Sequence, residues 1–89
     1  MTEHAVNTMD QKVEHIITSL QELAGESSVP RNVKNKIDEI IKVLTNEEEE
    51  LAIRKDRALN FLDEISEDTN LQSYTRTQVW NIATCLEML

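Results

Sequence analysis

The 89-residue sequence predicts an all-α protein, a single domain folded as an up-and-down bundle of four helices. Apolar residues recur at helical spacing in four separate segments. A single glycine and a single proline leave long stretches free for helix, and the β-branched and aromatic runs of a β domain are missing. The apolar pattern of the first half also returns at an offset of 42 residues, for example Leu20 as Leu62. Such an offset indicates two copies of one helical hairpin.

The first helix is expected from about Thr8 to Ala24. Thr8 and Gln11 have the spacing of a capping box, and Gly25 suits the left-handed conformation that often follows a helix end. Residues 1–7 are expected to form a loose N-terminal tail. The apolar stripe of this helix consists of Met9, Val13, Ile16, Ile17, Leu20 and Leu23.

The second helix is expected to begin near Pro30, whose fixed φ and missing N–H suit a first helical turn. Thr45 and Asn46 then form so short a link that the second and third helices must be antiparallel neighbours. Asn46 would open the third helix, with Glu49 in the capping-box position, and this helix would end near Ser66. The two apolar stripes consist of Val33, Ile37, Ile40, Ile41 and Leu44, and of Leu51, Ala58, Leu59, Leu62 and Ile65.

The fourth helix is expected after a loop from Glu67 to Ser73. Its apolar stripe consists of Val79, Ile82, Ala83, Leu86 and Leu89. A HEAT-like pair of stacked hairpins is the competing arrangement, but a solenoid generally needs about three or more repeats. The closed bundle is therefore the favoured fold.

The charge balance limits the classes of partner. Nine basic and seventeen acidic residues give a net charge of −8, which repels nucleic acid and anionic lipid. Two basic clusters, Arg31 to Lys36 and Arg54 to Arg57, lie among carboxylates and are expected to be solvated faces. The sequence shows neither a signal peptide nor an apolar stretch that could span a bilayer. We expect a cytoplasmic protein with no nucleic-acid and no membrane partner.

No residue pattern predicts an enzyme, a cofactor or a metal site. His4 and His15 are eleven residues apart, and neither has a glutamate three residues before it, as the histidines of di-iron bundles do. Cys85, the single cysteine, flanks an apolar stripe and is expected to be a packed thiol. The run from Glu47 to Glu50 is expected in the first turn of the third helix, where carboxylates offset the macrodipole.

A second group of carboxylates lies near the end of the third helix, where negative charge is unfavourable. Basic residues near the starts of the second and fourth helices are expected at the same end of the bundle, so we expect cross-helix ion pairs. A site for Ca²⁺ or Mg²⁺ is the alternative, without the spacing of an EF-hand loop. The acidic residues are Asp63, Glu64, Glu67 and Asp68, and the basic ones are Arg31, Lys34 and Arg76.

The aromatic residues break the repeat. Phe61, Tyr74 and Trp80 are the only three, and all lie in the second half, at positions that are polar in the first half. Ile53 likewise stands where the first copy has Gln11. Either the bundle covers these side chains internally, or they form an exposed association surface.

Several segments are distinctive enough to suggest a family. Ser28 to Asn32 before the second helix, Leu62 to Ser66 closing the third, and Tyr74 to Thr77 with Trp80 to Ile82 resemble the small archaeal proteins of Uncharacterised Protein Family 0147. The resemblance implies a four-helix bundle with no known activity, cofactor or catalytic residue. Gln72 departs from it, because it stands where a second proline-containing turn is expected.

The leading functional hypothesis is a non-enzymatic helical module for protein–protein interaction, which self-associates as a dimer. Its interface would be formed by Ile53, Phe61, Tyr74 and Trp80, with Trp80 as the anchor. An accessory or regulatory subunit that docks another protein through its acidic turn end is the alternative. A bundle that binds a divalent cation is the third hypothesis.

Overall fold

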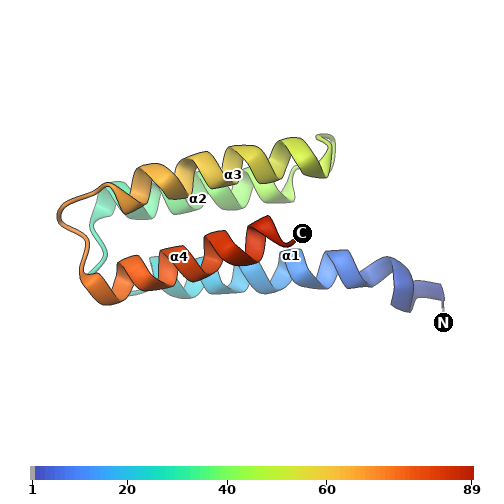
Figure 1. Ribbon diagram of the computed structural model, residues 1–89, viewed down its shortest axis with the longest axis horizontal. Helices are drawn as coiled ribbons and strands as arrows, with labels where there is room; N and C mark the ends of the chain where they lie inside the picture. The colour runs from blue at the N-terminus through green and yellow to red at the C-terminus, as the bar shows by residue number, and fades with distance from the viewer. Residues whose placement is uncertain (1) are drawn as a thin grey trace.

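The computed structural model describes the backbone of residues 2–89 and the side chains of residues 11–89. It contains four helices, α1 (Thr2–Ala24), α2 (Arg31–Thr45), α3 (Leu51–Ser66) and α4 (Ser73–Glu87), and no strand in this range. Each helix packs against the next, and α1 also packs against α4, so the four form a closed ring. Consecutive helices run in opposite directions (Figure 1). The predicted all-α four-helix bundle is confirmed.

The core fills the centre of this ring and draws on all four helices. Leu20, Ile37, Ile65 and Leu86 are completely buried, and Leu62 is 2% exposed. Phe61 and Leu59 are partly buried and pack against this cluster. Burying a side chain of this size stabilises the folded state by roughly 1.5–3 kcal/mol. Within the described residues, no helix is long and apolar enough to cross a bilayer.

Two features of α1 differ from expectation. The helix begins at Thr2, so residues 2–7 continue it and the expected capping box at Thr8 does not start it. The side chain of Thr8 lies outside the described residues. Gly25 does follow the helix, but its φ is not positive. The Gly25 N–H donates to the Gln21 carbonyl at 3.1 Å and to the Glu22 carbonyl at 3.2 Å, and the Glu26 N–H donates to the Leu23 carbonyl at 3.2 Å. The last turn thus tightens to three-residue spacing, which satisfies these carbonyls without a left-handed cap.

The turn between α2 and α3 is longer than predicted, and Asn46 does not open α3. Asn46 caps the C-terminus of α2, and its side-chain oxygen accepts the N–H of Glu48 at 3.2 Å. Glu47 to Glu50 therefore form the turn, and α3 begins only at Leu51. The prediction was wrong because asparagine favours tight turns as well as helix N-caps.

All three connections in fact share one geometry. In each, an N–H donates across three residues at 3.2 Å, from Val29 to Glu26, from Glu49 to Asn46 and from Leu71 to Asp68. The residue before each following helix is extended, with φ and ψ of −61° and 153°, −64° and 148°, and −70° and 152°. Those residues are Pro30, Glu50 and Gln72. Gln72 thus adopts the same extended conformation as Pro30, although it is not a proline.

Two arginine side chains connect the turns to the helices that follow them by hydrogen bonds. Arg54, the fourth residue of α3, donates to the Leu44 carbonyl at 2.9 Å and to the Glu49 carbonyl at 3.0 Å. Arg76, the fourth residue of α4, donates to the Ser66 carbonyl at 3.3 Å and to the Asp68 carbonyl at 3.0 Å. Each guanidinium satisfies carbonyls left over at a helix end and places positive charge at the negative end of the dipole.

Candidate interaction surface

The structure disperses the four predicted interface residues. Trp80 and Tyr74 are each 68% exposed and Ile53 is 40% exposed, whereas Phe61 is half-buried against the core. Phe61 lines a groove between α2 and α3, and Trp80 lines one between α3 and α4. Ile53 lies in the first turn of α3 and Tyr74 in the first turn of α4, at opposite ends of the bundle (Figure 1). That these four residues form one interface stays a prediction.

A better-defined surface is the solvent-exposed side of α4, which we call the α4 face. It is uncharged along almost its whole length, and Glu87 is the one exposed charged residue on this helix. The exposed side of α2, by contrast, carries Arg31, Asp38, Glu39 and Lys42. Loss of charge together with exposed aromatic and methionine side chains is typical of the centre of an interface. The α4 face consists of Ser73, Tyr74, Thr77, Trp80, Asn81, Thr84 and Cys85, together with Met88, which caps the end of the helix.

The two threonines of the α4 face are less polar than their type suggests. The Thr77 hydroxyl donates to the Ser73 carbonyl at 3.1 Å, and the Thr84 hydroxyl donates to the Trp80 carbonyl at 3.0 Å. Because both hydroxyl protons are already bound within the helix, an apolar partner can cover them without breaking a donated bond to water. The surface around Trp80 is therefore easier to desolvate than its sequence indicates.

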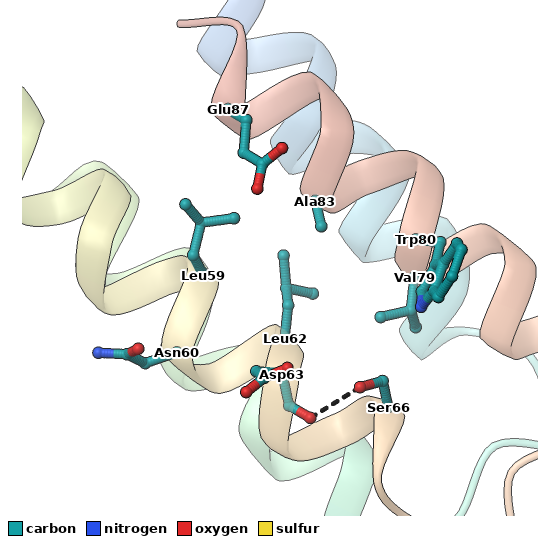
Figure 2. A pocket seen from close by; sticks show the side chains of 9 residues that line it. All are labelled: Leu59, Asn60, Leu62, Asp63, Ser66, Val79, Trp80, Ala83 and Glu87. Atoms are coloured by element: carbon teal, nitrogen blue, oxygen red, sulfur yellow. Dashed lines mark hydrogen bonds between the residues drawn. The ribbon is translucent and has the colours of Figure 1, made fainter.

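A groove between α3 and α4 lies beside Trp80. It has a volume of about 280 Å³, and its apolar lining comes from Leu59 and Leu62 of α3 and from Val79 and Ala83 of α4. Figure 2 shows Leu62 and Ala83 directed between the two helices and the Trp80 ring on the α4 side of the groove. The groove also holds two carboxylates, Asp63 and Glu87.

A second groove flanks α4 on the side of α1. It has a volume of about 230 Å³ and is lined by Gln78, Asn81 and Ile82 of α4. From the other side come Ser19, Leu23 and two carboxylates, Glu22 and Glu26. Thus a groove with a pair of acidic side chains borders the middle of the α4 face on each side.

The prediction of a packed thiol at Cys85 is wrong, because this side chain is exposed. It faces α1, where Lys12 and His15 line the same groove. Glu87, only two residues further on, lines the groove on the α3 side of α4 instead. The prediction failed because the flank of a buried stripe is covered only where a neighbouring helix supplies a side chain large enough.

The carboxylates at the turn end make fewer ion pairs than expected. Lys36 of α2 and Glu64 of α3 form a pair at 3.5 Å. Arg76, expected to pair with a carboxylate, instead donates to backbone carbonyls. Across residues 11–89, no three histidine, cysteine, aspartate or glutamate side chains are grouped so that they could hold a metal ion. The divalent-cation hypothesis therefore has no geometric support there.

Asp68 ties the turn between α3 and α4 to the start of α2. Its carboxylate accepts the side-chain N–H of Asn32 and the backbone N–H of Asn70, each at 2.8 Å. These hydrogen bonds, helped by the positive charges of Lys36 and Arg76, lower the pKa of the Asp68 carboxyl below its ordinary value. The charged form of Asp68 therefore favours the folded state.

Asp68 should make stability depend on acid pH. Because the pKa of Asp68 is lowered by folding, its contribution is complete above the ordinary value of 3.8, declines below that value and is lost once the pH falls through the lowered pKa of the folded state. Urea unfolding at a series of pH values should show a shallower acid loss of stability for Asp68→Asn than for the native chain. Asp56→Asn, at an exposed position of α3, is the matched control. Equal slopes for Asp68→Asn and the native chain would contradict the assignment.

Comparison with known proteins agrees with this architecture. The sequence model of the Uncharacterised protein family (UPF0147) matches residues 1–89. A UPF0147 protein of Methanosarcina mazei is 34% identical over 89 residues, which are 100% of this chain and 96% of that protein. One from Pyrococcus horikoshii is 35% identical over 85 residues, covering 94% of this chain and 91% of the relative.

A solved structure is similar as well. The crystal structure of the unknown-function protein MMP1188 superposes with a TM-score of 0.83 at 41% identity, covering 88% of this chain and 89% of that one. The resemblance in the turn segments and in the fourth helix is thereby confirmed over the whole chain. The chain belongs to the Uncharacterised protein family UPF0147.

Proposed function

We propose that this protein is a non-enzymatic module for protein–protein interaction that docks through its α4 face and self-associates there. The observation that carries the proposal is the exposure of Trp80, 68%, at the centre of an uncharged helix face. Tryptophan is among the residues that most often supply the energy of an interface, and such anchors lie near its centre. An exposed indole flanked by satisfied threonine hydroxyls has the composition of a surface that a partner covers.

Self-association would pair the α4 face with the same face of a second copy about a two-fold axis, the commonest symmetry of soluble oligomers. A standard interface takes roughly 800 Å² from each partner. The chain exposes 5952 Å² in total, and α4 is only 15 residues long. The dimer would therefore also use the grooves beside α4, and it would work against the net charge of −8 on each copy.

Light scattering tests self-association. The native chain, 10.3 kDa as a monomer, is expected to reach twice that mass within the micromolar range, and more readily in high salt, because salt screens the repulsion. Trp80→Glu should restore the monomer mass, since it puts a charge at the centre of the interface. Ile53→Glu is the matched control, because it adds the same charge at an exposed position away from α4.

Three outcomes of this experiment are decisive. A native chain that stays monomeric at both low and high salt concentration would remove self-association from the proposal. A dimer that survives Trp80→Glu would place the interface elsewhere than on the α4 face. Dissociation by Ile53→Glu alone would move the interface to α3.

A further inference from the structure

We infer that the α4 face takes a basic amphipathic helix of another protein more tightly than it takes a second copy of this chain. The inference rests on the proposed function, because it names the partner for the same surface. The expected partner segment has an apolar stripe at helical spacing, flanked on both edges by Lys or Arg. Helices of this kind commonly bind by laying the apolar stripe on an apolar surface of the partner.

The first argument is the distribution of charge around Trp80. On the α3 side, Asp63 and Glu87 line the groove, and no basic residue lines it with them. On the α1 side, Glu22 and Glu26 line the corresponding groove, again without a basic residue among the lining side chains. The middle of the α4 face is therefore an uncharged strip between two acidic borders.

The nearby basic residues offset only part of the charge of these four carboxylates. Arg76 lines a groove with Thr77, Trp80 and Asn81 and so adds one positive charge beside the strip, with its guanidinium bound to the Ser66 and Asp68 carbonyls. Lys55 donates to the Glu87 carbonyl at 3.1 Å, at the C-terminal end of α4. Lys12 lines a groove with Cys85 and Met88, also near that end. Four carboxylates against one arginine in the grooves beside the middle of the α4 face leave its borders negative on balance.

The second argument compares the two occupants. A second copy would bring its own acidic borders against those of the first, and like charges across an interface are unfavourable. A helix with basic edges would meet Asp63 and Glu87 on one side and Glu22 and Glu26 on the other. Its apolar stripe would cover Trp80 and the two threonines, whose hydroxyl protons are already bound. Charge and polarity thus both favour the basic helix.

Trp80 is the only tryptophan of the chain, so its fluorescence reports directly on the occupant of the α4 face. The probe is a synthetic peptide as long as α4, free of tryptophan, with a leucine stripe and lysines on both edges. In a second peptide every lysine is replaced by glutamate. A third peptide has the composition of the first in scrambled order, so it keeps the positive charge but lacks the leucine stripe. The lysine peptide is expected to shift the emission of Trp80 to the blue in a saturable way, and the other two are not.

Charge variants test where the peptide binds. Neutralising the four border carboxylates together (Glu22→Gln, Glu26→Gln, Asp63→Asn, Glu87→Gln) should weaken binding roughly tenfold or more, because four exposed ion pairs are lost. Neutralising four glutamates of the turn between α2 and α3 (Glu47→Gln to Glu50→Gln) removes the same charge away from α4 and is the matched control. Circular dichroism of both variants confirms that each is folded.

The outcomes separate this inference from the proposed function. Equal weakening by the two sets of variants would reduce the binding to general charge attraction and would overturn the inference. So would a lysine peptide that causes no emission shift, or that leaves a native dimer intact in light scattering. In those cases a dimer sensitive to Trp80→Glu would still uphold the proposed function. Both fall if the peptide does not bind and Trp80→Glu changes no association.

Discussion

Truncation of Leu20 to Ala is expected to lower the free energy of unfolding by about 2–5 kcal/mol. Leu20 is completely buried in α1, and Leu62 of α3, which lies 42 residues further along the sequence, is 2% exposed. Each faces the centre of the ring, where removing three carbons leaves a cavity that neighbouring helices cannot fill. Leu62→Ala should therefore have an effect of the same size. Urea unfolding followed by circular dichroism measures both.

An exposed position supplies the control for these truncations. Ile53→Ala, at 40% exposure, should change the free energy of unfolding by only about 0.5 kcal/mol, as surface substitutions usually do. A loss of less than about 0.5 kcal/mol for Leu20→Ala or Leu62→Ala would mean that the helix concerned is rotated away from the core.

Arg54→Ala is expected to lower the free energy of unfolding by about 1.5–3 kcal/mol, the range for hydrogen bonds to a charged group. The side chain is part-buried and donates to the carbonyls of Leu44 and Glu49, so its removal leaves both without this partner. Arg54→Lys should recover only part of the loss, since an ammonium lacks the planar fork that reaches two carbonyls at fixed angles. The same unfolding measurement applies.

Arg57→Ala is the matched control, because Arg57 is an exposed arginine on the same helix, one turn further on. Its truncation is expected to stay within about 0.5 kcal/mol of the native chain. Equal effects at Arg54 and Arg57 would show that the turn does not depend on the arginine.

The helices were predictable because helical spacing of apolar residues records which side of each helix is buried. Leu20, Ile40 and Leu62 were all placed in the core correctly. The boundary at Asn46 was not predictable, because the same residue type ends one helix or begins the next, and tertiary contacts decide between them. The arginine contacts did leave a signal, since a basic residue recurs as the fourth helical residue at Lys34, Arg54 and Arg76.

The candidate surface was predictable only in part. Aromatic residues pointed to the second hairpin, but helical spacing does not fix how α3 and α4 are rotated about their axes. Phe61 therefore turned toward α2, while Trp80 turned toward solvent beside α3. A stronger signal was present in the run from Thr77 to Leu86, which contains no charged residue in a chain that is 29% charged. That run includes the centre of the α4 face.

The closed ring of helices also determines the order in which the molecule can assemble. Three of the four helix–helix contacts in the ring join helices that are consecutive in the chain. A short turn brings each of these pairs together at little entropic cost. The contact between α1 and α4 joins the first and last helices and requires the longest loop closure. During synthesis on the ribosome, α1 therefore keeps one apolar flank open to solvent until α4 has emerged.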